Sequence, residues 1–192
     1  MREASETKLL SSMKPGQVYR RKKLVAFSKS VDRDLSKLLK AGEVKKVSPG
    51  MYLKREKSQF GPLPPDDREL VRTFLGDHRF LITSFNNYNS LGLGLTQLRN
   101  DTIVYNRKRH VKTKLGSKTF VFKNVREFPR HLSKEFLVVD LLNNLNEVGE
   151  PEDQVLSNLK AKIPEYDKVK LAQMSSRYGK VRTQKLLEEL SA

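Results

Sequence analysis

The chain has 192 residues, no cysteine, and a formal net charge of +16 at pH 7 that comes from 38 Lys and Arg against 22 Asp and Glu. The absence of cysteine excludes disulfides, thiolate metal sites and cysteine nucleophiles. The sequence has no run of about eighteen apolar residues and no apolar signal-peptide core at its start, which predicts a cytoplasmic protein without a membrane span.

The positive charge lies in the first two thirds of the chain. Residues 1–57 sum to +10, residues 58–132 to +7, and residues 133–192 to −1. A field of this sign attracts polyanions to the first two segments, whereas the last segment has no electrostatic reason to approach them. We therefore expect a nucleic-acid partner, in preference to a basic surface that only keeps the protein in solution.

The first segment predicts short helices separated by turns. One helix over 5–13 ends at Pro15-Gly16, and a second spans 21–27. The second helix has an apolar side made by Leu24, Val25 and Phe27. The tripeptide Ser28-Lys29-Ser30 then offers hydroxyl groups that can cap a third helix.

The third helix is amphipathic and ends at Gly42, a residue that accepts a left-handed conformation. Its apolar residues share one stripe at helical spacing: Val31, Leu35, Leu38 and Leu39. The opposite stripe carries Lys29, Arg33, Ser36, Lys37 and Lys40. In a helix-turn-helix the early residues of the second helix meet base edges and later basic residues meet phosphates. We expect base contacts from Lys29, Ser30 and Arg33, and backbone contacts from Lys37 and Lys40.

Two short strands over 44–47 and 51–54 follow, joined by Ser48-Pro49-Gly50. The alternation of apolar and polar residues in these strands is imperfect, because Val44 stands at an even position and Val47 at an odd one. Such a hairpin forms the wing of a winged helix-turn-helix. The lysines of the hairpin and Arg55 after it would contact DNA phosphates. The alternative is a helix pair that merely has a basic exposed face. The expected DNA-binding residues are Arg20, Arg21, Lys22, Lys29, Ser30, Arg33, Lys37, Lys40, Lys45, Lys46 and Lys54.

Residues 16–65 contain the elements R-K-K-L, V-D-R-D-L-S-K-L-L-K-A-G, S-P-G-M-Y-L and F-G-P-L-P-P, and L-I-T-S-F, Y-N-S-L-G and G-L-T-Q follow between 81 and 97. This pattern resembles the winged helix-turn-helix antitoxins of type IV abortive-infection systems, the AbiEi-like family, over most of residues 16–135. The resemblance implies a transcriptional autorepressor of a toxin-antitoxin operon and an antitoxin that counteracts a nucleotidyltransferase-like toxin without a stable complex. Its DNA partner would be a double-stranded operator with inverted repeats, bound by a monomer or dimer.

The sequence predicts an α+β protein with an N-terminal winged helix-turn-helix over residues 1–57 and a Pro-rich linker over 58–67. A mixed α/β domain with a helical C-terminal segment follows over 68–192. Asp66-Asp67 can cap a helix to about residue 75, and β-rich runs occupy 102–105 and 119–122, with a hairpin through 112–117. From Ser133 onward the pattern predicts helices whose apolar residues either form a dimer surface or, more commonly, complete the core of this domain.

A second basic run lies between the two β-rich segments. It is a possible second nucleic-acid patch, or else the solvated flank of a hairpin, and it comprises Arg107, Lys108, Arg109, Lys112 and Lys114 together with His110. Tyr105 next to the run could stack on an unpaired base.

The residues favour a binding protein, not an enzyme, with neither a metal nor a cofactor. The three histidines, His78, His110 and His131, are far apart and form no metal-binding motif. The alternative function is a metal-dependent nuclease that uses the winged helix to bind its substrate and Asp101, Glu127 and a lysine to cleave it.

Overall fold

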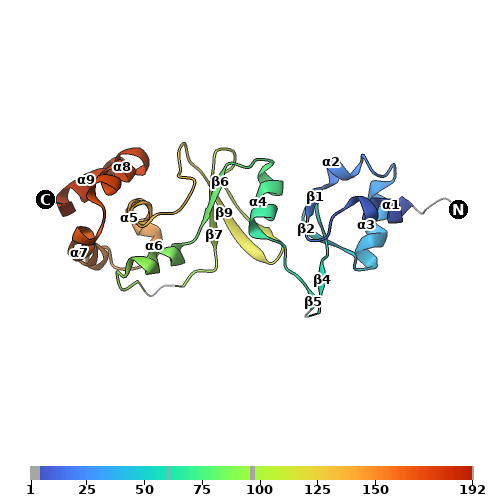
Figure 1. Cartoon of the computed structure of the whole chain (residues 1–192), viewed down its shortest axis with the longest axis horizontal. Coiled ribbons are helices and arrows are strands. Elements are labelled where there is room, and N and C mark those ends of the chain that lie inside the picture. Colours follow the sequence, from blue (N-terminus) through green and yellow to red (C-terminus); the bar gives the residue numbers. More distant parts are fainter. Residues whose placement is uncertain (1–4, 60, 96–97, 192) are drawn as a thin grey trace. The chain divides into compact units, whose positions relative to one another are not determined.

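A computed structural model of the chain describes residues 5–59, 61–95 and 98–191 and is a mixed α+β protein (Figure 1). Its contacts divide it into two compact units, the first made of Met1–His78 and Lys112–Thr119 and the second of Arg79–Val111 and Phe120–Ala192. The domain boundaries expected from the sequence stay a prediction. Three residues of the resemblance, Phe60, Thr96 and Gln97, lie outside the described residues.

The first unit begins with the element order helix, strand, helix, helix, strand, strand. These elements are α1 (Ser5–Ser12), β1 (Val18–Arg20), α2 (Arg21–Leu24), α3 (Val31–Lys40), β2 (Val44–Ser48) and β3 (Met51–Lys54). Their strands form an antiparallel sheet in the order β1-β3-β2, in which β2 is an edge strand and β1 is a strand that the sequence pattern did not predict. In Figure 1 the helices α1, α2 and α3 gather on one side of β1 and β2.

The core of this part confirms the apolar stripe expected for the third helix. It consists of Leu9, Met13, Leu24, Val31, Leu35, Leu38 and Val44, with Leu39 partly buried against it. Gly42 follows α3 at φ 73°, as expected for a residue that ends a helix. The prediction for the second helix was wrong at its end, because α2 stops at Leu24 and leaves Val25 and Phe27 in a turn, 49% and 42% exposed.

The β2–β3 hairpin confirms the expected strand pair and explains its irregular alternation. Val44 and Val47 are both buried, but only Val44 belongs to the core formed with the helices. A register shift between Lys46 and Ser48 marks a bulge at Val47. The other face of the sheet is covered by α4 (Asp67–Leu75), which packs against β1. The strand β2 is not buried along its whole length, because Lys45 and Lys46 between the two valines are exposed, and the bulge accounts for the irregular alternation.

The proline-rich segment before α4 contains a minimal strand pair, where the sequence predicted no regular structure. The strands β4 (Lys57–Ser58) and β5 (Gly61–Pro62) pair antiparallel. The helix α4 begins as expected, since the Asp66 carboxylate accepts a hydrogen bond from the backbone N–H of Glu69 at 3.2 Å.

A four-stranded sheet contains β6 (Phe80–Thr83), β7 (Thr102–Asn106) and β9 (Lys118–Asn124), with β8 (Val111–Leu115) as the last strand in the order β6-β7-β9-β8. The strand β7 is antiparallel to β6 and parallel to β9. A 3₁₀ helix, η1 (Phe85–Leu91), follows β6. Residues 112–119, which contain nearly all of β8, the turn and the start of β9, are grouped with the first unit.

The C-terminal segment is helical, as the sequence predicted. Its helices are α5 (Lys134–Asn143), α6 (Leu145–Val148), α7 (Glu152–Lys162), η2 (Ile163–Glu165), α8 (Lys168–Tyr178) and α9 (Val181–Ser191), coloured orange to red in Figure 1. Their leucines pack together with η1, and Leu141, Leu159 and Leu187 are buried in this cluster, so the tail completes the core of its own unit. Among residues 5–59, 61–95 and 98–191, no helix has the length and apolar character needed to cross a bilayer.

Candidate functional site

Four of the eleven residues expected to contact DNA lie along one exposed side of α3 or just before it: Lys29, Arg33, Lys37 and Lys40. Lys29, Arg33, Ser36, Lys37 and Lys40 are all exposed, opposite the buried stripe. The Arg33 guanidinium donates to the Ser30 hydroxyl at 3.2 Å, and the Lys37 ammonium lies 3.0 Å from the Glu6 carboxylate of α1. These contacts hold the two side chains along the helix surface.

The start of α3 is fixed by a buried carboxylate that sequence reasoning missed. Asp34 is fully buried, and its Oδ2 accepts hydrogen bonds from the hydroxyls of Ser28 and Ser5, both at 2.5 Å, and from Ser30 at 3.3 Å. Among the described residues its Oδ1 has no hydrogen-bond partner. The hydroxyls of Ser28 and Ser5 lower the pKa of this carboxyl. Asp34 therefore ties the turn before α3 and the first residue of α1 to the helix itself.

Ser30 does not cap α3 in the way the sequence suggested. It occupies the N-cap position, but its side chain makes no capping hydrogen bond and instead donates to Asp34. The Ser28 hydroxyl accepts the backbone N–H of Ser30 at 3.0 Å. A residue at position 34 stands on the apolar stripe of α3, three residues after Val31, and this spacing was the available signal that Asp34 would point inward.

Several of the expected DNA-binding cations are engaged within the protein. The Arg20 guanidinium donates to the backbone oxygens of Thr73 at 2.7 Å and Phe74, at the end of α4. The Lys54 ammonium donates to the oxygens of Leu10 and Met13, at 2.9 and 2.8 Å, where α1 ends. Cations commonly satisfy the last carbonyls of helices in this way. Arg20 and Lys54 thus hold helix ends in this structure.

Arg21 joins α2 to α3 through a two-point ion pair. Its Nε donates to Asp32 Oδ1 at 2.7 Å and its Nη2 to Asp32 Oδ2 at 2.5 Å. The Arg21 guanidinium holds the pKa of the Asp32 carboxyl below its ordinary value. Because the pair is exposed, it orients the two helices without being a large source of stability.

The remaining lysines of the expected set are exposed and make no ion pair with any described residue. They are Lys22 on α2, Lys29 before α3, Lys40 at its end, and Lys45 and Lys46 on β2. Because β2 is an edge strand, both of its lysines reach solvent although adjacent side chains point to opposite faces.

The second basic run begins in a turn organised by Asn106, which is fully buried. Its Oδ1 accepts the backbone N–H groups of Lys108 and Arg109, at 2.8 and 2.7 Å. Arg107, Lys108, Arg109, Lys112 and Lys114 are all exposed, but the division between the units falls within the run. A nucleic-acid contact by this run stays a prediction.

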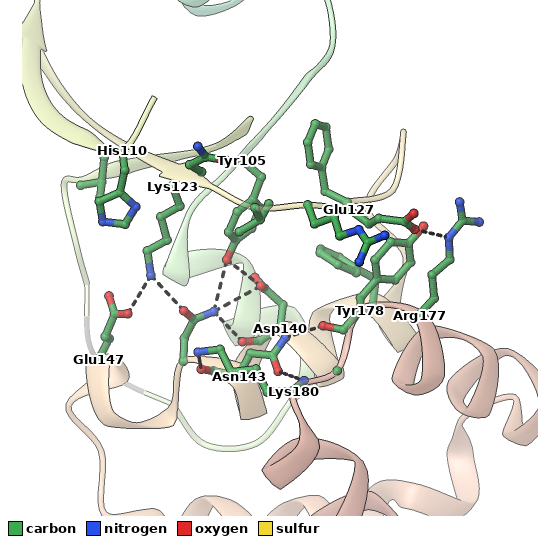
Figure 2. A pocket seen from close by; sticks show the side chains of 18 residues that line it. Tyr105, His110, Lys123, Glu127, Asp140, Asn143, Glu147, Arg177, Tyr178 and Lys180 are labelled. Atoms are coloured by element: carbon green, nitrogen blue, oxygen red, sulfur yellow. Dashed lines mark hydrogen bonds and ion pairs between the residues drawn. The ribbon is translucent and has the colours of Figure 1, made fainter. Parts of the chain in front are cut away.

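The expectation that Tyr105 stacks on a base was wrong, because the ring is 5% exposed and its hydroxyl is engaged in the interior. The Tyr105 hydroxyl donates to Asp140 Oδ1 at 2.6 Å, and the Tyr88 hydroxyl donates to Asp140 Oδ2 at 2.8 Å. Asn144 donates to Asp140 Oδ1 at 3.2 Å and accepts from Lys123 at 2.9 Å (Figure 2). Sequence reasoning missed this network, although Asp140 is the one charged residue in the run F-L-V-V-D-L-L.

The network holds Asp140 and both tyrosines in a buried environment. Burial raises the pKa of Asp140, even though the hydroxyls of Tyr105 and Tyr88 donate to its oxygens. Burial also raises the pKa of both tyrosines, so they remain neutral donors. Lys123, which donates to Asn144 of this network, also forms an ion pair in which its Nζ lies 2.7 Å from Glu147 Oε1.

The acids expected for the alternative nuclease function form no cluster in the described part of the chain. Glu127 is exposed and pairs with Arg177 at 2.9 Å. Residues 5–59, 61–95 and 98–191 contain no group of three or more His, Asp or Glu side chains that could hold a metal ion. Comparison with protein-family models, with curated proteins and with solved structures found no match to this chain.

Proposed function

We propose that this protein binds double-stranded operator DNA through a winged helix-turn-helix made by α1–α3 and the β2–β3 hairpin. The observation that carries the proposal is the two-sided character of α3. One side of the helix packs into the core, and the other is exposed and basic. Helix-turn-helix proteins place such a helix in the major groove.

In this proposal Lys29, Ser30 and Arg33 read base edges. Arginine and lysine donate hydrogen bonds to the O6 and N7 atoms of guanine, and this is the commonest specific contact in the major groove. The buried Asp34 supports this role because it fixes the backbone of the turn that carries these side chains. A reading helix needs such fixing, since a shift along the groove would exchange one base for its neighbour.

In the same proposal, the exposed lysines without an ion-pair partner bind phosphates of the DNA backbone. Lys22, Lys40, Lys45 and Lys46 have no acidic partner among the described residues, so they can replace the counterions of phosphate groups without first breaking an ion pair. Arg20 and Lys54 are left out of the proposed contacts because they bind helix carbonyls, and Lys37 would have to leave Glu6.

We further propose, from the sequence resemblance, that the protein represses its own operon and counteracts a nucleotidyltransferase-like toxin encoded beside it. The proposal predicts that the neighbouring open reading frame encodes such an enzyme. Coexpression of the two genes should restore growth that the neighbour alone arrests. A neighbouring gene of another class, or no rescue, would contradict the antitoxin role and leave DNA binding to be judged separately.

DNA binding is tested with fragments from upstream of the protein's own coding sequence, in which single base pairs are varied. Arg33→Ala should lose about 1–3 kcal/mol of discrimination at one base-pair position. Lys45→Ala should instead weaken binding to all sequences alike. Lys160→Ala, on the exposed side of α7, is the matched control and should bind as the wild type does. Equal effects of the first two variants, or no preference over random DNA, would refute the proposal.

A further inference from the structure

The second unit contains a cavity of about 810 Å³ that the proposed DNA contacts do not use. Its lining comes from the end of β9, from the segment that follows β9, and from α5 and α8 (Figure 2). The volume lies within the range of roughly 300–1,000 Å³ that small-molecule sites occupy. The cavity therefore has room for a ligand larger than a single ion.

One wall of the cavity is aromatic. Tyr178 is half-buried and packs edge-on against Phe136, with ring centroids 5.5 Å apart. Phe128 and Tyr105 line the same space, and both are almost fully buried. Rings fixed by packing can contact a planar ligand at a low cost in side-chain entropy.

Another part of the cavity carries an excess of positive charge around Glu127. Arg177 pairs with Glu127, and the charges of Arg107 and Arg126 also lower the pKa of this glutamate. Arg126 and Arg177 both line the cavity beside Glu127. Two guanidinium groups thus stand against one carboxylate there, and the surplus positive charge can accept a second anion.

The polar groups at the floor of the cavity are already satisfied within the protein. The Asn144 amide bonds to Asp140 and Lys123, and Asn143 accepts from the backbone N–H of Lys180 and donates to the oxygen of Tyr178. Figure 2 marks the contacts of Asp140, Asn143 and Lys180 with dashed lines. A ligand would gain little from hydrogen bonds there, so its affinity has to come from ring contact and from the arginines.

From this arrangement we propose that the cavity binds a nucleotide, with its phosphate at Arg126 and Arg177 and its base against the ring of Tyr178. A bare phosphate would leave the aromatic wall unused, and an apolar ligand would leave the two arginines without an anion. The nucleotide can be free or can be the terminal nucleotide of an RNA strand, because both present the same phosphate and base. The inference concerns the second unit alone and does not depend on operator binding.

The test is calorimetric titration of the full chain with uridine and adenosine 5′-monophosphates, the matching nucleosides, and inorganic phosphate. A decauridylate with or without a 5′-phosphate, titrated in parallel, distinguishes RNA from free nucleotide as the source. The variants are Arg126→Gln combined with Arg177→Gln, both exposed positions, and Tyr178→Leu, which keeps an apolar side chain in the wall. Lys160→Gln is the control because it lies outside the cavity lining.

We expect the double arginine variant to weaken nucleotide binding by about tenfold or more, since each lost charge-assisted contact has an effect of that size. Tyr178→Leu should weaken nucleotide binding and leave the weak binding of inorganic phosphate unchanged, and the control should match the wild type. Preference for the 5′-phosphorylated strand over free nucleotides would assign the site to an RNA end, and the opposite preference to a free nucleotide. The proposal is overturned if inorganic phosphate binds as tightly as the nucleotides, if the arginine variant binds normally, or if neither nucleotides nor RNA bind at millimolar concentration.

Discussion

The salt dependence of DNA binding gives the sharpest test of the proposed interface. Four unpaired lysines, Lys22, Lys40, Lys45 and Lys46, are assigned to phosphates. Each neutralised phosphate contributes about −0.9 to the slope of log affinity against log salt concentration, so these lysines predict a slope of about −3.6. The double variant Lys45→Ala and Lys46→Ala should reduce the slope to about −1.8.

In practical terms, raising the salt fourfold should weaken wild-type binding about 150-fold and that of the double variant about 12-fold. Fluorescence anisotropy with a labelled operator fragment measures both slopes. Lys160→Ala combined with Lys185→Ala removes two exposed lysines of the second unit and serves as the control, for which the slope should stay at the wild-type value. An unchanged slope in the β2 variant would refute the assignment of this hairpin to the DNA backbone.

Three further predictions concern stability. Asp34→Ala should lower the free energy of unfolding by about 1–3 kcal/mol in urea titrations, because the hydroxyls of Ser5 and Ser28 lose their acceptor. Since the pKa of Asp34 is lowered in the folded state, this difference should shrink as the pH falls below about 4, and a difference independent of pH would contradict it. The pKa of Asp140 is raised in the folded state, so the free energy of unfolding of the wild type should fall as the pH rises above about 4. The Asp140→Asn variant should lack that fall. Parallel pH profiles of the two proteins would count against the reasoning. Gly42→Ala should destabilise the protein by about 1 kcal/mol, because Gly42 has a φ of 73°, which residues with a Cβ atom adopt at a cost. Thermal unfolding measures the effect, and an unchanged unfolding midpoint would show that the turn adapts.

Most helices could be predicted from the sequence because their apolar residues repeat at helical spacing. The stripe of α3 and the Asp66 cap of α4 appear in the structure as expected. The errors fall where the pattern is short. Val25 and Phe27 looked like part of an apolar helix side, but α2 has only four residues and leaves both exposed. Only the pairing with β3 makes residues 18–20 a strand.

The candidate site was harder to predict because a charged residue looks alike in sequence whether it points outward or inward. Lys45 and Lys54 both lie in the predicted hairpin, yet Lys45 is exposed and Lys54 binds the carbonyls that end α1. The partners of Lys54 are more than forty positions away, so no local pattern contains them. The same reason hides the contact between Arg20 and the end of α4.

The sequence by itself determined that the chain is strongly basic in its first two thirds, rich in amphipathic helices, and without cysteine chemistry. These properties depend on composition and on short-range periodicity. Only the tertiary structure decided which cations remain unpaired, that Asp34 and Asp140 are buried acceptors, and that Tyr105 faces inward. The physical reason is that burial and ion pairing arise from contacts between segments distant along the chain, and the cost of leaving a buried polar group unpaired selects those contacts during folding.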